Sequence, residues 1–326
     1  MRRLMATIIG FLVLVLFLSA CNTNSAPAEP LRIACPPNPN MIPLFVAMDR
    51  HQENLNIELV PVPGVPELAA AVQGGQADVA LFFSAAGAKQ FNKGTLTSLR
   101  LWNVNVWRAL YLVAEPRFDS LESLRGQKIL ASFPGGAPDL VMRAAMRQAG
   151  YDPDTDFVIE YLPAAQARQL LLAGQGQAAL LPEPQVTALI SKAAQQGQTL
   201  QPAVDLQAGF SAENWEADYI PLGGVFVTEA LASDADRRAA LEQFIAAYDE
   251  AAAYAMSHPA EAGEITARAF KEYFGGQLPA EAVISALENG RLVFNSRPVA
   301  ALRPDLDQFL ALIVGQAPAD EFYAAP

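Results

Sequence analysis

The chain has 326 residues, of which 52% are hydrophobic and 17% are charged. This composition excludes a disordered protein, which would be poor in apolar residues. At roughly 100–200 residues per domain the length predicts two domains, and a chain of this size can bury a core without a disulfide or a metal.

The N-terminus has the pattern of an export signal. Arg2 and Arg3 precede an apolar run of 11 residues that ends at Leu18, whereas a helix needs about 20 residues to span a bilayer. The run ends in Leu-Ser-Ala-Cys, which resembles the lipobox of bacterial lipoproteins. We therefore expect a signal peptide over residues 1–20 and a lipid on Cys21, which would anchor the chain at the extracytoplasmic face of the cell membrane. The alternative is an ordinary secretory cut near Ala20 with an incidental cysteine.

Removal of residues 1–20 leaves 20 Lys and Arg against 34 Asp and Glu, a net charge of −14. This charge argues against nucleic acid and an anionic membrane surface as partners. With Cys21 lipidated, Cys35 has no partner for a disulfide, and we expect it to be a buried thiol. His51 and His258 lie far apart in the sequence, and no residue spacing indicates a metal site.

The elements expected after the polar tether at residues 21–30 alternate between strands and helices. Strands are predicted at 31–35, 56–62 and 78–83, and helices at 41–50 and 67–74. This order implies a parallel sheet covered by helices. Two further apolar runs follow, at 98–106 and 109–114.

A second α/β unit is predicted after these runs. It begins with a short helix at 121–126 and contains strands at 128–132, 157–161 and 178–181, with helices at 138–149, 164–173 and 184–196. A strand is expected over 219–228. From residue 234 onward the sequence predicts mostly helix, at 234–257, 259–274, 279–289 and 303–314.

Four segments carry a resemblance to a known family: the lipobox, LRIACPPNPNMIPLFVAMDR with ELAAAVQGGQADVALF, SLESLRGQKILASFPGGAPDLVMRAAMRQAGYDPD, and ARQLLLAGQGQAALLPEPQVTALI. They resemble the substrate-binding proteins of ABC importers for nitrate, sulfonate, taurine and thiamine-pyrimidine precursors. The resemblance implies a type II periplasmic binding protein fold, in which two Rossmann-like α/β lobes are joined by a two-segment hinge with a ligand cleft between them. It implies a first lobe over 31–107 and 225–326, a second over 114–219, and hinge segments at 108–113 and 220–224.

Ligands in open α/β sheets bind beyond the C-terminal ends of the strands. In the first lobe this rule selects Asn38 and Asn40 after the first strand, and Phe83 and Ser84 after the third. Ser84 is expected at a helix start, where backbone N–H groups are free to meet an anion or a carbonyl. Asn40 could instead be the N-cap of the helix that begins at Met41.

In the second lobe the same rule selects the loop with Phe133, Gly135, Gly136 and Asp139. The glycines let the backbone approach a ligand. Asp139 could contact the ligand, or it could simply interact favourably with the helix dipole. Glu183 ends the last strand of this lobe. It could accept a hydrogen bond from a ligand N–H or cap the following helix.

Aromatic side chains are expected near these loops at Trp102, Trp107 and Tyr219, while Arg108 is the one basic residue among the selected positions. A free sulfonate or phosphate would recruit more Arg, Ser or Thr donors, whereas aromatic faces suit a planar ring. The pattern favours a heteroaromatic, vitamin-precursor-like ligand. A sulfonate, taurine or nitrate ligand of the same importer class is the alternative.

The resemblance implies a monomeric solute-binding lipoprotein that works with ABC permease and ATPase subunits and needs no cofactor. An enzyme resembling pyrimidine-precursor synthases and a sensory ligand-binding module are the other classes considered. No nucleophile elbow, P-loop or His-containing triad is found, so we expect no enzyme.

Overall fold

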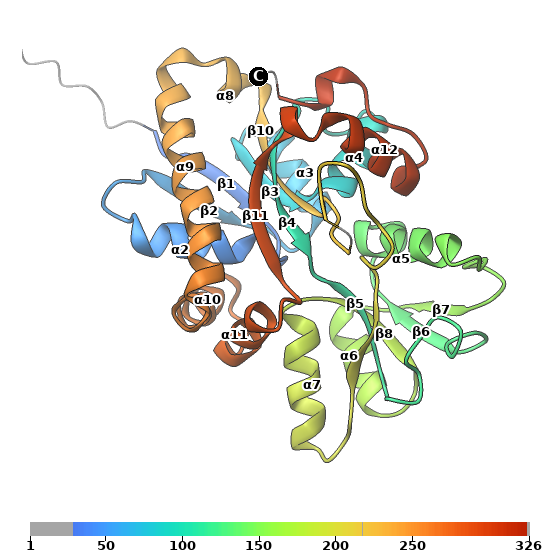
Figure 1. Cartoon of the computed structure of the whole chain (residues 1–326). Coiled ribbons are helices and arrows are strands. Elements are labelled where there is room, and N and C mark those ends of the chain that lie inside the picture. The colour runs from blue at the N-terminus through green and yellow to red at the C-terminus, as the bar shows by residue number, and fades with distance from the viewer. Residues whose placement is uncertain (1–28, 217, 325–326) are drawn as a thin grey trace, which may run out of the picture. The chain divides into compact units, whose positions relative to one another are not determined.

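The computed structural model describes residues 29–216 and 218–324. Two separate mixed sheets, each flanked by helices, make up the folded part of the chain (Figure 1). The expected signal peptide over residues 1–20 and Cys21 lie outside the described residues. No helix within the described residues is long and apolar enough to cross a membrane.

The first sheet has six strands in the order β11-β4-β10-β3-β1-β2. Strands β1, β2 and β3 run parallel, and β10 pairs antiparallel with both β3 and β4. Helices α2 and α9 pack together on one face, while α4 and α12 pack together elsewhere on the sheet (Figure 1). The bounds are β1 Leu31–Cys35, α2 Met41–Arg50, β2 Ile57–Pro61, α3 Val65–Gln73, β3 Val79–Phe83, α4 Ser84–Asn92, β4 Leu99–Arg108, β10 Gly223–Thr228, α8 Glu229–Ser233, α9 Ala235–Ser257, α10 Pro259–Phe274, α11 Ala280–Glu288, β11 Val293–Pro298 and α12 Arg303–Val314.

The second sheet has five strands in the order β7-β6-β8-β5-β9. Strand β6 runs parallel to β7 and β8, and β5 runs antiparallel to β8 and β9. The bounds are β5 Leu110–Ala114, β6 Lys128–Ala131, α5 Ala137–Gln148, β7 Val158–Tyr161, α6 Ala164–Leu172, β8 Ala178–Pro182, α7 Gln185–Gln195 and β9 Gln201–Asp205. We call the elements around the first sheet the first lobe and those around the second sheet the second lobe.

The chain passes between the sheets twice. Strand β4 ends at Arg108 and β5 begins at Leu110, and the return segment runs over residues 206–222 between β9 and β10. The two passages meet where the backbone N–H of Ile220 donates to the carbonyl of Trp107 at 2.9 Å. We call residues 108–110 and 206–222 the crossing segments.

Two expectations about local structure are wrong, and two strands were not expected. Residues 121–126 form successive turns instead of a helix. Strands β9 and β11 add to the expected elements, while the region after residue 234 is mostly helical, as expected. The first sheet is mixed because β10 enters it from the second lobe and runs antiparallel to its neighbours.

The helix that begins at Ser84 packs closely on its sheet because Gly87 has no side chain. A Cβ at Gly87 would lie 2.4 Å from Cζ of the buried Phe226 ring. Phe226 in turn contacts Phe82, with ring centroids 4.6 Å apart. This close packing fixes the position of α4, and with it the position of the side chains that α4 presents to the second lobe.

Candidate functional site

The two lobes touch at the carboxyl ends of their strands. Lys89 in α4 of the first lobe donates through Nζ to the carbonyl of Gly135, which follows β6 of the second lobe. Burial, together with the nearby charge of Lys93, lowers the pKa of Lys89. Arg291, which precedes β11, reaches Glu183 at the end of β8. Each contact joins a first-lobe side chain to a second-lobe residue that lies just beyond the carboxyl end of a strand.

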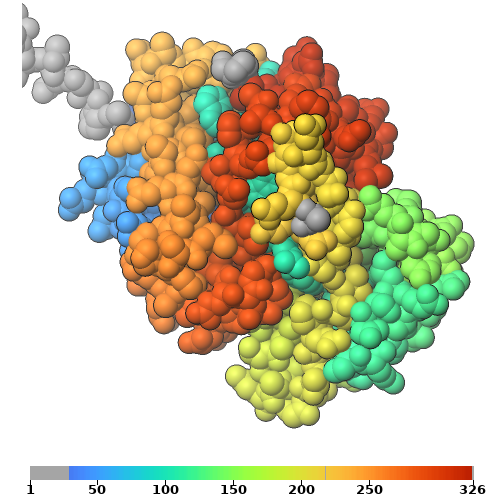
Figure 2. All heavy atoms as spheres, in the orientation of Figure 1, coloured from blue at the N-terminus to red at the C-terminus, as the bar shows by residue number. Residues whose placement is uncertain are grey.

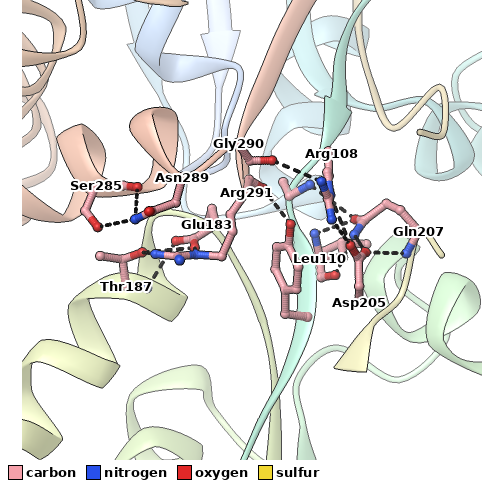
Figure 3. Close-up of polar contacts among 12 residues, drawn as sticks. Arg108, Leu110, Glu183, Thr187, Asp205, Gln207, Ser285, Asn289, Gly290 and Arg291 are labelled. Carbon is pink, nitrogen blue, oxygen red and sulfur yellow. Dashed lines mark hydrogen bonds and ion pairs between the residues drawn. The ribbon is translucent and has the colours of Figure 1, made fainter. Parts of the chain in front are cut away.

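Glu183 is fully buried and has three donors from the protein (Figure 3). Its Oε1 accepts from Arg291 Nε at 2.8 Å and from Thr187 Oγ1 at 2.9 Å, and its Oε2 accepts from the Thr187 backbone N–H at 3.1 Å. Burial raises the pKa of Glu183, while the bonds from Arg291 and Thr187 oppose that rise. The carboxylate, just before α7, thus accepts a backbone N–H of the first turn of that helix and also pairs with an arginine of the other lobe.

The guanidinium of Arg108, in the first crossing segment, is hydrogen-bonded to other groups of the protein. Its Nε donates to Asp205 Oδ2 at 3.0 Å, its Nη2 donates to the same oxygen, and its Nη1 donates to the Gly290 carbonyl at 3.3 Å (Figure 3). Gln207 accepts from the backbone N–H of Leu110 and donates to its carbonyl at 2.8 Å. Arg108 therefore connects the first crossing segment to the end of β9 and to the loop before β11, and Gln207 ties the two crossing segments together.

The first-lobe amides form a local network. Asn38 donates to the Leu81 carbonyl at 3.0 Å, and its Oδ1 accepts from the backbone and side-chain nitrogens of Asn40. Asn40 occupies the N-cap position of α2, but its side chain caps no backbone N–H. Its Oδ1 is buried and has no hydrogen-bond partner among the described residues.

Ser84 differs from the expected free helix start. Its backbone N–H donates to the Leu222 carbonyl at 2.9 Å and its hydroxyl donates to the Pro221 carbonyl. The side chain is fully buried. Ser84 thus joins α4 to the second crossing segment. The two lie close together because β10, which follows that segment, pairs directly with β3, which precedes α4.

The loop after β6 carries a strained aromatic residue. Phe133 is 66% exposed and has a φ of 55°, a left-handed conformation that is uncommon for a residue other than glycine. Its carbonyl accepts from the Gly136 N–H at 2.7 Å, and Gly135 has a φ of 69°. The turn therefore presents the Phe133 ring outward at the start of α5.

Asp139 is buried and its carboxylate is satisfied within the second lobe. It accepts from the Gly135 N–H at 2.7 Å, from Tyr161 at 2.8 Å and from Arg143 Nε at 3.1 Å. The carboxylate thus holds the glycine turn on α5, in addition to its favourable place in the first helical turn.

Three polar residues at this edge were not selected from the sequence. Ser132 directly follows β6, and its buried Oγ has no partner among the described residues. The sequence predicted Ser132 as the last residue of a strand, and that position was a usable signal. Lys89 and Arg291 carry no such local signal, because the fold brings them to the edge from the interior of α4 and from the loop after α11.

Two of the five aromatic residues selected near the loops line a pocket at the crossing segments. Trp107 is buried and Tyr219 is half-buried. They line the pocket together with Glu213, Asn214, Trp215, Glu216, Asn295 and Arg297. Phe83 is half-buried at the end of β3. Trp102 is not part of this pocket and instead lies 5.3 Å from the guanidinium of Arg238 in α9.

Among the described residues no group of three or more His, Cys, Asp or Glu side chains is placed to hold a metal ion. Cys35, in β1, is fully buried, and burial raises the pKa of its thiol.

The family of the chain follows from a comparison with models of protein families. Residues 24–269 match the model of the NMT1-like family. The chain belongs to the NMT1-like family. A comparison of this NMT1-like protein with curated proteins finds no match.

Solved structures similar to this NMT1-like protein have the type II periplasmic binding protein fold. An ABC transporter protein from Parabacteroides distasonis is 18% identical, with a TM-score of 0.67 over 91% of this chain and 99% of that one. The periplasmic aliphatic sulphonate-binding protein SsuA from Escherichia coli is 19% identical, with a TM-score of 0.65 over 89% and 91%. The periplasmic nitrate-binding protein NrtA from Synechocystis PCC 6803 is 16% identical, with a TM-score of 0.60 over 81% and 71%. The expected two-lobe fold is confirmed.

Proposed function

We propose that this NMT1-like protein is an extracytoplasmic solute-binding lipoprotein, without catalytic activity, that delivers a small organic molecule to the permease and ATPase of an ABC importer. The observation that carries the proposal is the meeting of the two lobes at their strand ends. Gly135 and Glu183 of the second lobe contact Lys89 and Arg291 of the first. Similar architectures occur in proteins whose names state sulphonate or nitrate binding.

We propose a heteroaromatic ligand as the favoured class. The aromatic residues support this class more than the two carboxylates do, because Asp139 and Glu183 both have protein partners. Trp107 and Tyr219 line a pocket beside the crossing segments, and aromatic faces of this kind stack on planar rings.

A sulfonate, taurine or nitrate ligand is the second candidate, and one observation favours it. Lys89 of α4 reaches the loop before α5, and the hydroxyl of Ser132 in that loop has no partner among the described residues, so both could donate to an anion. The backbone N–H groups of a helix start add to such a site.

The anchor and the import role are tested together in cells. Cys21→Ser should release the protein from the membrane fraction, because the thiol is the proposed point of lipid attachment. A strain that lacks the chain should lose uptake of one labelled compound from a panel of vitamins, pyrimidines, flavins, sulfonates and nitrate. A Cys21→Ser protein that stays in the membrane fraction refutes the anchor, and unchanged uptake of the whole panel refutes the import role.

A further inference from the structure

A loop of the first lobe reaches the second lobe beside the passage of the chain between them. We call residues 289–292, between α11 and β11, the α11–β11 loop. Figure 3 shows Arg291 of this loop pointing toward Glu183 and Thr187 of the second lobe. Figure 2 shows the orange-red surface around α11 meeting the yellow-green surface around α7, and the two helices are in contact. The lobes are therefore joined here by side chains as well as by the crossing segments.

Arg291 is bonded to the second lobe through both its side chain and its backbone. Its Nε donates to Glu183 Oε1 and its Nη2 donates to Thr187 Oγ1, each at 2.8 Å. Its carbonyl accepts from the hydroxyl of Tyr111 in β5 at 3.0 Å. The three partners are buried, and the side chain of Arg291 is 20% exposed. Separation of the loop from the second lobe would leave the buried carboxylate without its arginine, which is strongly unfavourable.

The partners of the α11–β11 loop lie at the covalent connection between the lobes. The backbone N–H of Glu183 donates to the carbonyl of Ala109, within the first crossing segment, at 2.7 Å. Tyr111 directly follows that segment, and Arg108 Nη1 donates to the Gly290 carbonyl at 3.3 Å. A rotation displaces atoms in proportion to their distance from its axis, so groups beside the connection move least when the lobes rotate. The loop can therefore stay bonded to the second lobe during such a rotation.

The contact between Lys89 and Gly135 has a different character. It joins a flexible lysine side chain to a backbone carbonyl, and both residues are only half-buried. Water can solvate the amine and the carbonyl after they part, so this separation costs little. In Figure 1, α4 and α5 lie on one side of the passage from β4 to β5, whereas α11 and α7 lie on the other. The lobes thus have a strong contact on one side of the passage and a weak one on the other.

We propose that the α11–β11 loop is a third, noncovalent hinge segment of this chain. Arg291 stays bonded to Glu183 whether the lobes are open or closed. The lobes open on the other side of the passage, where Lys89 leaves Gly135. The loop thereby restricts the direction of opening more than the two crossing segments alone would. The inference goes beyond the proposed function, because it concerns how the lobes move and holds for any solute.

Distances between pairs of nitroxide spin labels test the inference in the soluble Cys21→Ser protein without added solute. One pair of labels, on Glu288→Cys and Lys192→Cys, spans α11 and α7 at exposed positions. The other pair, on Lys93→Cys and Gln148→Cys, spans the exposed ends of α4 and α5. The thiol of β1 is fully buried and does not take up the label. Double electron–electron resonance gives the distance distribution of each pair.

The two contacts should respond separately to replacement. Lys89→Met should shift the α4–α5 distribution to longer distances and leave the α11–α7 distribution narrow. Arg291→Met should broaden the α11–α7 distribution. Because this replacement leaves a buried carboxylate unpaired, the charge-balanced double variant Glu183→Gln with Arg291→Met is measured beside it and should broaden the same distribution. Arg117→Met is the matched control, because this exposed arginine pairs with Glu115 within the second lobe, and it should change neither distribution.

Three results overturn the inference. The first is an α11–α7 distribution that lengthens together with the α4–α5 distribution in Lys89→Met, because the lobes would then part at the loop as well. The second is an α11–α7 distribution that stays narrow in both variants that lack Arg291. The third is an α4–α5 distribution that Lys89→Met leaves unchanged. Failure of the proposed function is recognised separately, by unchanged uptake of the whole panel in cells that lack the chain.

Discussion

The replacement Asp78→Asn tests whether the first lobe is held together as the structure describes. Asp78 is 6% exposed and lies just before β3. It accepts from Arg32 through the backbone N–H at 3.0 Å, Nε at 3.0 Å and Nη2 at 2.9 Å, and from Arg237 Nη1 and Nη2 at 3.1 and 3.0 Å. One carboxylate therefore connects β1, β3 and α9, which are far apart in the sequence.

The expected loss of stability follows from the charge and exposure of Asp78, Arg32 and Arg237. Removing one partner of a fully buried ion pair costs about 3–5 kcal/mol. The side chains of Arg32 and Arg237 are 33% and 25% exposed, so water compensates part of the loss and we expect about 2–3 kcal/mol. For a chain of this size that corresponds to a fall in Tm of roughly 4–6 °C.

The effect should depend on pH in one direction. Burial alone would raise the pKa of Asp78, but the hydrogen bonds from Arg237 and Arg32 outweigh burial and lower it. A carboxyl whose pKa is lower in the folded state stabilises the protein above its unfolded pKa of about 3.9, and this stabilisation is lost as the pH falls through the folded pKa. The difference between Asp78→Asn and the unaltered protein should therefore be largest at neutral pH and shrink below about pH 4.

Urea unfolding between pH 7 and pH 3 measures this difference. Glu264→Gln is the control, because Glu264 is exposed and the structure shows no ion pair for it among the described residues. Equal urea midpoints for Asp78→Asn and the unaltered protein at pH 7 would refute the reasoning. So would a difference between them that does not change with pH.

Three further predictions concern the site and the thiol. Glu183→Gln should weaken binding of the ligand by less than ten-fold if the carboxylate hydrogen-bonds only to Arg291 and Thr187. If the carboxylate instead accepts a hydrogen bond from a ligand N–H, the affinity should fall by about ten- to a hundred-fold. Calorimetric titration distinguishes the two outcomes. In the Cys21→Ser protein, Cys35 should not react with a thiol reagent in the native state and should react fully in guanidinium, because the thiol is buried and burial raises its pKa; rapid native labelling would contradict the structure. Ligand should reduce the radius of gyration in small-angle scattering, and an unchanged radius with binding confirmed would argue against closure of the lobes.

The order of strands and helices was largely predictable because it depends on local patterns. The alternation of apolar runs with helical periodicity predicted most elements to within a few residues. Strand β11 was not predicted because its Asn295, Ser296 and Arg297 interrupt the apolar pattern. Its strand conformation comes from pairing with β4, almost two hundred residues earlier, which no local pattern reports.

The candidate site was only partly predictable for a similar reason. The rule of strand ends selected Glu183 and Asp139, but it could not reveal their partners. Arg291 lies 108 positions from Glu183. The sequence therefore suggested that the carboxylates of Glu183 and Asp139 are available to a ligand, whereas in the folded chain both are hydrogen-bonded to protein groups.

The most direct measurement of the central claim is a thermal-shift screen of the soluble Cys21→Ser protein. The panel contains vitamins, pyrimidines, flavins, sulfonates and nitrate. A ligand at 100 times its Kd adds about 2.7 kcal/mol to the stability of the folded state, which corresponds to a rise in Tm of roughly 5 °C for a chain of this size. We predict a saturable rise of this order with a heteroaromatic compound and none with taurine or nitrate. A rise with taurine or nitrate alone would contradict the ligand class, and no rise with any member of the panel would contradict a solute-binding role for these compounds.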